Sequence, residues 1–198
     1  MATQLANHGH AEPVGPAYTA ANAVTLARTL GTVVIGGVAI GADHPALLVV
    51  AYAVYWAGDM LDGLVARRLD QETRLGAVLD IVSDRACTSI LCVGLLAYQP
   101  TVALAAIPFF ASFMVLDTML SLSFLCFPII SPNYFGQVDR TVYRLNWSPP
   151  AKALNTAGVV ALALAGAVEI SAALAVLLIA VKVWSAARVL AAIEGKAR

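Results

Sequence analysis

Four aspartates lie in two pairs within apolar parts of the chain, and together they could bind a divalent metal ion. Asp59 and Asp62 are three residues apart, and Asp80 and Asp84 are four apart. On a helix, either spacing places both carboxylates of a pair on one face. A connection of about eight residues would make the two helices antiparallel neighbours, so their acidic faces can converge. Carboxylate oxygens of this kind suit Mg²⁺ or Mn²⁺ better than zinc.

Acids in apolar sequence require a partner that offsets their charge. A carboxylate at the centre of a bilayer costs roughly 2.5–3.5 kcal/mol, and four ionised carboxylates side by side would also repel one another. Divalent cations would offset both costs. The alternative is that the acids cap helices or pair with Arg67, Arg68 and Arg85, but such contacts account for only one or two of the four. The pattern of four therefore predicts a metal site.

The rest of the chain indicates that these acids are carried by membrane helices. Of 198 residues, 60% are hydrophobic and 12% are charged, against roughly 45–50% and 25% in ordinary soluble domains. Since about 20 mostly apolar residues cross a bilayer as a helix, we expect an all-α, polytopic integral membrane protein with six transmembrane helices. We predict one domain over residues 17–198, after a mobile tail over residues 1–16. The predicted spans are residues 23–42, 46–67, 75–97, 101–126, 151–168 and 170–193.

Positive charge gathers on one side of these predicted spans. With an even number of spans both termini share a side, and the Lys and Arg residues of the connections lie there too, whereas the opposite loops carry none. Cytoplasmic loops are enriched in these residues, so we expect the site to face the cytoplasm, from a plasma membrane expected to be bacterial. The long connection over residues 128–150 is either part of the site or a passive connector. Zero net charge argues against a nucleic-acid partner.

The acid pairs belong to a longer motif that resembles the signature of the CDP-alcohol phosphotransferases at every fixed position. The motif reads Asp59-x2-Asp62-Gly63-x2-Ala66-Arg67-x8-Gly76-x3-Asp80-x3-Asp84. The segment from Asn22 to Arg28 is also similar to an Asn-x2-Thr-x2-Arg element of that family, with Ala21 where a proline often stands. The resemblance covers the predicted helices and implies a six-helix membrane enzyme that assembles as a homodimer.

The resemblance implies transfer of a phosphatidyl group from CDP-diacylglycerol to an alcohol, with CMP as the leaving group. Asp59, Asp62 and Asp80 would hold one or two Mg²⁺ or Mn²⁺ ions against the pyrophosphate. Asp84 would act as the general base and could also contact a second ion. The residues expected to bind the CDP moiety are Thr25, Asp62, Gly63, Ala66, Arg67 and Gly76.

The acceptor pocket is expected around Asp117, an acid inside the fourth predicted span. An intramembrane acid is a candidate functional residue by default; it could bind acceptor hydroxyls or pair with Lys182. Residues 101–126 contain no Lys or Arg, which favours an uncharged polyol over a phosphorylated acceptor. The full set of residues considered for this pocket is Arg74, Arg85, Asp117, Arg144 and Lys182.

Local sequence favours inositol as the acceptor. Residues 59–63, 71–80 and 84–85 look most similar to eukaryotic-type phosphatidylinositol synthases. This chain departs from that group after Asp117, where Leu120 and Ser121 replace the usual Ser-His. The alternatives are a phosphatidylglycerophosphate or phosphatidylinositol-phosphate synthase, which use phosphorylated acceptors. A cation-dependent transporter or a scaffold is a remoter alternative, since transporters tend to have interrupted helices and midplane sites.

Overall fold

The computed structural model describes residues 14–196, and every regular element in that range is helical. The tail predicted over residues 1–16 falls almost wholly outside the described residues. Its last part, residues 14–16, lies against the start of the third helix, where the backbone N–H of Leu75 donates to the carbonyl of Val14 at 3.0 Å.

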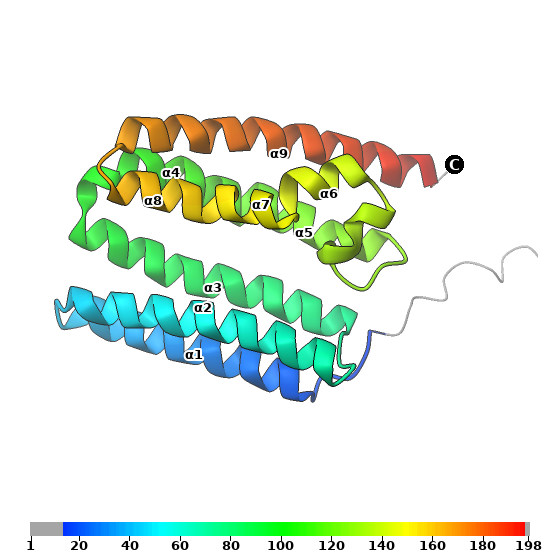
Figure 1. The fold of residues 1–198 in the computed structure, drawn as a ribbon, viewed down its shortest axis with the longest axis horizontal. Helices are drawn as coiled ribbons and strands as arrows, with labels where there is room; N and C mark the ends of the chain where they lie inside the picture. The colour runs from blue at the N-terminus through cyan, green and yellow to red at the C-terminus, as the bar shows by residue number, and fades with distance from the viewer. Residues whose placement is uncertain (1–13, 197–198) are drawn as a thin grey trace, which may run out of the picture.

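The helices run back and forth along one direction in two groups (Figure 1). The first group is α1 (Ala20–Gly41), α2 (Pro45–Arg68) and α3 (Arg74–Tyr98). The second group contains two interrupted rods and one long helix. The first rod consists of η2 (Pro100–Val102), α4 (Ala103–Ala111), η3 (Ser112–Asp117), α5 (Thr118–Leu122) and η4 (Ser123–Cys126). The connection that follows contains η5 (Pro132–Gln137) and α6 (Arg140–Asn146). The second rod consists of α7 (Pro149–Lys152), η6 (Ala153–Gly158) and α8 (Val159–Leu164), and the long helix is α9 (Val168–Lys196).

Side-chain caps fix where the helices that carry the site begin. The hydroxyl of Thr19 accepts from the backbone N–H of Asn22 at the start of α1, and Thr73 accepts from Gly76 at the start of α3. Such caps satisfy backbone donors that have no partner within the helix. Because α3 starts at a fixed residue, the acids that follow about two and three turns later have a fixed height and face.

Four helices are long and apolar enough to cross a membrane: α1, α2, residues 100–126 and residues 168–195. The described residues are therefore all-helical, as the sequence predicts, and their apolar helices fit a multi-pass membrane protein. The predicted count of six is not established by these criteria. Of the other two expected spans, α3 carries Asp80, Asp84 and Arg85, and residues 149–164 form a short rod broken by η6.

The connection over residues 128–150 is packed into the molecule. Phe135 and Trp147 are buried in the same hydrophobic cluster as Phe124 of η4 and Val189 of α9. The rings of Phe135 and Trp147 lie 4.7 Å apart between centroids. The connection therefore covers one end of the helix bundle, and its position relative to the site is fixed by this cluster.

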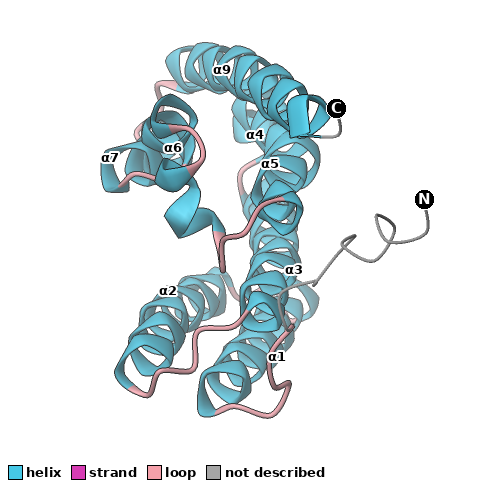
Figure 2. Ribbon diagram, turned by 90° about the vertical axis from the view of Figure 1, so that its right-hand side faces the viewer, coloured by secondary structure: helices cyan, strands magenta, loops and turns pink. Residues whose placement is uncertain are grey.

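Two π-helical turns, η3 and η6, interrupt the rods of the second group. Single wide turns of this kind occur frequently at functional sites. Residues of both turns line the cavity described below. The view in Figure 2 shows α1, α2 and α3 on one side and the rods that carry these turns on the other.

Candidate active site

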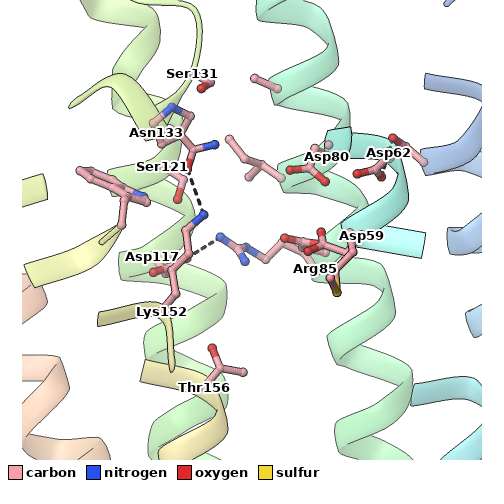
Figure 3. A pocket seen from close by; sticks show the side chains of 18 of the residues that line it. Asp59, Asp62, Asp80, Arg85, Asp117, Ser121, Ser131, Asn133, Lys152 and Thr156 are labelled. Atoms are coloured by element: carbon pink, nitrogen blue, oxygen red, sulfur yellow. Dashed lines mark hydrogen bonds and ion pairs between the residues drawn. The ribbon is translucent and has the colours of Figure 1, made fainter. Parts of the chain in front are cut away.

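A cavity of about 730 Å³ lies between the two helix groups. One wall comes from α2 and α3, and the opposite wall comes from η3, η6, α9 and the connection over residues 128–150. Figure 3 shows Asp59, Asp62 and Asp80 on one side of this space, with Asn133 and Lys152 facing them from the other side. The acids predicted from the sequence therefore lie on one wall of this cavity.

We call Asp59, Asp62, Asp80 and Asp84 the acid quartet, since the structure brings all four together around one guanidinium. Arg28 of α1 donates from Nε to Asp62 at 2.8 Å and from Nη1 to Asp84 at 3.1 Å. Its Nη2 lies 2.5 Å from Asp80 and 3.3 Å from Asp59. The i,i+3 and i,i+4 spacings thus place both pairs on facing helix surfaces, as the sequence predicts.

The acid quartet fits a divalent cation. Asp59, Asp62 and Asp80 each offer one carboxylate oxygen such that all three oxygens lie within 4.8 Å of one another. Several anionic oxygens at this spacing match the ligands that Mg²⁺ and Mn²⁺ prefer. Asp84 follows Asp80 by one turn and also lines the cavity. The donor set therefore supports three ligands beside a fourth, nearby carboxylate.

The residues expected at the CDP moiety line the same cavity as the acid quartet. Gly63, Ala66, Arg67 and Gly76 all line the cavity. A Cβ on Gly63 would come within 3.3 Å of Nη1 of Arg67, and one on Gly76 would come within 3.0 Å of the side-chain oxygen of Asn22. Glycine at position 63 leaves room beside the guanidinium of Arg67, whose donors suit phosphate oxygens, and glycine at position 76 leaves room beside Asn22.

Thr25 joins α1 to the acid quartet. Its hydroxyl donates to Asp62 Oδ2 at 2.9 Å, the same oxygen that receives Nε of Arg28. Thr25 is 4% exposed and Asp62 is 6% exposed, so these bonds are shielded from water. The contact places Thr25 beside a predicted metal ligand, and Thr25 also lines the cavity.

Asp117 pairs with two cations at the far end of the cavity. Its Oδ1 contacts Nζ of Lys182, and its Oδ2 lies 2.7 Å from Nη2 of Arg85. Arg85 also donates to the hydroxyl of Thr118 at 2.7 Å and lies over the ring of Phe113, with 3.8 Å to the centroid. Of the two roles left open by the sequence, the structure shows the pairing with Lys182. Asp117, Arg85 and Lys182 all line the cavity.

Two residues considered for the acceptor pocket do not reach the cavity. Arg74 donates to the carbonyls of Leu125 and Phe127, at 2.7 and 3.5 Å, and so ties the start of α3 to the end of η4. Arg144 lies on the exposed face of α6. Neither lines the cavity, so the geometry gives no support to an acceptor role for them.

Two cations at the site were not assigned to it from the sequence. Arg28 could have been found, because Asn22, Thr25 and Arg28 follow one another at three-residue steps and so share a helix face. Lys152 lines the cavity and donates to the side-chain oxygen of Asn133 at 2.9 Å. No sequence pattern identifies Lys152, because its position depends on how residues 128–150 pack.

Comparison with known proteins agrees with this geometry. The family model for CDP-alcohol phosphatidyltransferase matches residues 18–187. Two curated relatives are named CDP-diacylglycerol–inositol 3-phosphatidyltransferase. The one from Candida albicans is 46% identical over 63 residues, covering 31% of this chain and 27% of the relative. The one from Schizosaccharomyces pombe is 41% identical over 61 residues, covering 31% of this chain and 26% of the relative.

These two matches span only about a quarter of each relative's length. No solved structure matches the chain. The family match, by contrast, extends over all the residues of the cavity wall described above and includes the acid quartet. The chain therefore belongs to the CDP-alcohol phosphatidyltransferase family, as its aspartate motif predicts.

Proposed function

We propose that this protein transfers a phosphatidyl group from CDP-diacylglycerol to an uncharged polyol, inositol first, and releases CMP as a step of phospholipid biosynthesis. The observation that carries the proposal is the acid quartet on the wall of a cavity that is also lined by Arg67 and by Asp117, Arg85 and Lys182, which we call the Asp117 cluster. The family match supports the donor, and the names of the two yeast relatives support inositol.

The donor end of the cavity suits a nucleoside diphosphate. When bound, a divalent ion would neutralise charge on the pyrophosphate as the bond to CMP breaks. Asp59, Asp62 and Asp80 would hold it there. Arg67 presents a planar fork of donors for phosphate oxygens. The absent side chains of Gly63 and Gly76 let the nucleotide approach the helix backbones.

Asp84 is the residue proposed to act as general base. It lies on the cavity one turn beyond Asp80, so an acceptor hydroxyl could approach it while the other three acids hold the divalent ion beside the pyrophosphate. Asp84 would take the proton from that hydroxyl, whose oxygen forms a bond to the phosphatidyl phosphorus. The bond from this phosphorus to CMP breaks in the same displacement, and CMP leaves with the electron pair.

The acceptor end favours an uncharged polyol. Arg85 and Lys182 are both paired with Asp117, which leaves them fewer free donors for an acceptor phosphate. A triad of charged groups can instead donate to and accept from several hydroxyls. Lys152 favours the alternative, a phosphorylated acceptor such as glycerol 3-phosphate or inositol phosphate. It donates a hydrogen bond to the neutral Asn133, so that bond does not neutralise its positive charge.

An acceptor screen tests the proposal. Protein purified in detergent would be given CDP-diacylglycerol, Mn²⁺ or Mg²⁺, and one of myo-inositol, inositol phosphate or glycerol 3-phosphate. We expect CMP release with myo-inositol alone, and none when a chelator removes the divalent ion. Release with a phosphorylated acceptor instead would replace the acceptor assignment and keep the donor chemistry. No release with any acceptor would contradict the donor chemistry, and the remoter transporter or scaffold alternative would then stand.

The placement in the membrane is part of the proposal. We infer a site facing the cytoplasm, supported by the Lys and Arg residues at the end of the bundle that carries the acid quartet. A homodimer is implied by the family resemblance. Gly37 and Gly41 of α1 meet open space, which is compatible with close packing by a second copy. The bacterial plasma membrane stays a prediction, since both relatives named above are yeast proteins.

A further inference from the structure

Arg28 is the most completely buried charged residue of the site, and the aspartate motif does not explain why it is there. Its side chain is 2% exposed. It does not line the cavity, whereas all members of the acid quartet do. The guanidinium therefore contacts the acid quartet from inside the protein, on the side away from the substrates.

The contacts use one oxygen of each carboxylate. They are Oδ1 of Asp59, Oδ2 of Asp62, Oδ1 of Asp80 and Oδ1 of Asp84. A carboxylate has two oxygens and several acceptor sites. The second oxygen of each group is thus available to a ligand that arrives through the cavity, so Arg28 and a divalent ion can be bound together.

Packing against α2 fixes the position of Arg28. A Cβ on Gly58 would overlap with Cβ of Arg28 and would come within 2.9 Å of its Cδ, closer than real Cβ contacts allow. Gly58 precedes the aspartate motif and does not line the cavity. Glycine at this position therefore leaves room for the aliphatic part of the Arg28 side chain. The close packing of α1 against α2 holds the guanidinium behind the acid quartet.

The net charge of the acid quartet and Arg28 indicates what this arrangement does. The acid quartet carries a charge of 4− when ionised, and Arg28 reduces it to 3−. Without Arg28, the mutually repelling carboxylates would lose the one cation that contacts all four of them in the described residues. With it, a fixed positive charge opposes both that repulsion and the attraction of a second cation, since like charges a few ångströms apart repel strongly in a shielded site.

We propose that Arg28 is a positioning residue that acts as the resident counter-cation of the acid quartet. It keeps the four carboxylates assembled while metal and pyrophosphate come and go, and it limits how tightly a divalent ion is held. This inference rests on the metal site of the proposed function. It assigns to Gly58 the supporting task of admitting the side chain of Arg28.

The test compares thermal unfolding of purified protein in chelator and in Mn²⁺. A rise in Tm of the wild type with Mn²⁺ tests the metal site itself and does not depend on Arg28. We expect Arg28→Gln to unfold at a lower temperature than the wild type in chelator and to recover much of that loss in Mn²⁺. Mn²⁺ affinity, measured from the free-ion electron paramagnetic resonance signal, should be roughly tenfold or more tighter in Arg28→Gln, because a unit charge close to the ion is gone.

Three further variants make the result interpretable. Arg28→Lys keeps the positive charge but loses the several donors of the guanidinium. Its Mn²⁺ affinity should therefore fall between those of the wild type and Arg28→Gln. This variant replaces Arg28→Gln in the comparison if Arg28→Gln does not fold. Gly58→Ala should resemble Arg28→Gln, because the methyl group displaces the arginine. Arg188→Gln is the matched control: it removes an arginine from an ion pair with Asp139 outside the cavity, so its Tm loss should be equal with and without Mn²⁺. Equal losses for Arg28→Gln, or weaker Mn²⁺ binding, would overturn the proposal.

Discussion

At the scale of single residues, the proposed reaction depends on which carboxylate of the acid quartet takes the proton from the acceptor hydroxyl. Three members of the acid quartet present oxygens close enough to share one ion, and Asp84 is the remaining member. Arg28 contacts all four, so the division of labour cannot come from Arg28. In the proposed mechanism it comes from position on the cavity wall, because Asp84 follows Asp80 by one turn of α3.

Replacing Asp84 by Asn tests its role as base. An amide cannot take the proton from the acceptor hydroxyl, so CMP release with the active acceptor should fall roughly 10²–10⁴-fold. Mn²⁺ should still raise the Tm of the variant, because Asp59, Asp62 and Asp80 are unchanged.

Asp70→Asn is the control for this substitution. Asp70 is exposed in the connection between α2 and α3, does not line the cavity, and has φ +51°, a conformation that Asn tolerates. Its CMP release should match that of the wild type. Undiminished release by Asp84→Asn would show that another group takes the proton.

At the scale of elements, the N-cap residue of α6, Asp139, also ties this helix to α9. Asp139 accepts from the backbone N–H groups of Thr141 and Val142 at 2.8 and 3.0 Å and pairs with Arg188 of α9 at 2.7 Å. Burial acts to raise the pKa of Asp139. The hydrogen bonds from Val142, Arg188 and Thr141 outweigh it and hold that pKa below its ordinary value.

This lowered pKa predicts a pH-dependent contribution to stability. The stabilisation is fully present above the ordinary Asp pKa of about 3.9, and it is lost as pH falls through the lower folded-state value. Asp139→Ala should cost about 1 kcal/mol of unfolding free energy near neutral pH, since it removes a cap. Asp139→Asn should cost less, because Asn also caps. Thermal unfolding from pH 7 to pH 3 measures both, and a gap to wild type that stays constant over this range would contradict the assignment.

The helices that carry the site show which of its features could be predicted from the sequence and why the others could not. The facing of Asp59 with Asp62, and of Asp80 with Asp84, follows from helical spacing, which is local. That Arg28 meets all four depends on how α1 packs against α2 and α3, which spacing alone does not give. The π-turns at η3 and η6 carry no sequence signal of this kind. The packed form of residues 128–150 depends on long-range contacts of Phe135 and Trp147.

For the whole molecule, the cavity lies between two helix groups, and α3 packs against the second group through apolar side chains. Polar side chains tie the two groups together as well. Arg85 reaches from α3 in the first group to Asp117 and Thr118 in the second. Tyr134 of η5 donates to Glu72 in the connection between α2 and α3 at 2.9 Å. The Asp117 cluster is the more deeply buried of these ties, since the side chains of Arg85 and Lys182 are 13% and 5% exposed.

The tie at Asp117 should therefore stabilise the whole molecule as well as shape the acceptor end of the cavity. Asp117→Asn leaves the buried Lys182 and the largely shielded Arg85 without their carboxylate, a change that costs about 3–5 kcal/mol in buried pairs. For a chain of this length that amounts to a loss of roughly 6–20 °C in Tm. Lys182→Met is the matched control, because Asp117 keeps its pair with Arg85 at 2.7 Å, so its loss should be clearly smaller.

Adding Lys182→Met to Asp117→Asn should recover part of the loss, because one uncompensated charge is removed. The acceptor role is separated from this structural role by kinetics at a temperature where all variants are folded. If Asp117 also contacts the acceptor, Asp117→Asn raises the KM for myo-inositol more than Lys182→Met does, and the KM for CDP-diacylglycerol stays unchanged. A Tm within about one degree of wild type for Asp117→Asn would show that Arg85 and Lys182 do not depend on Asp117, and that the two helix groups are held together elsewhere.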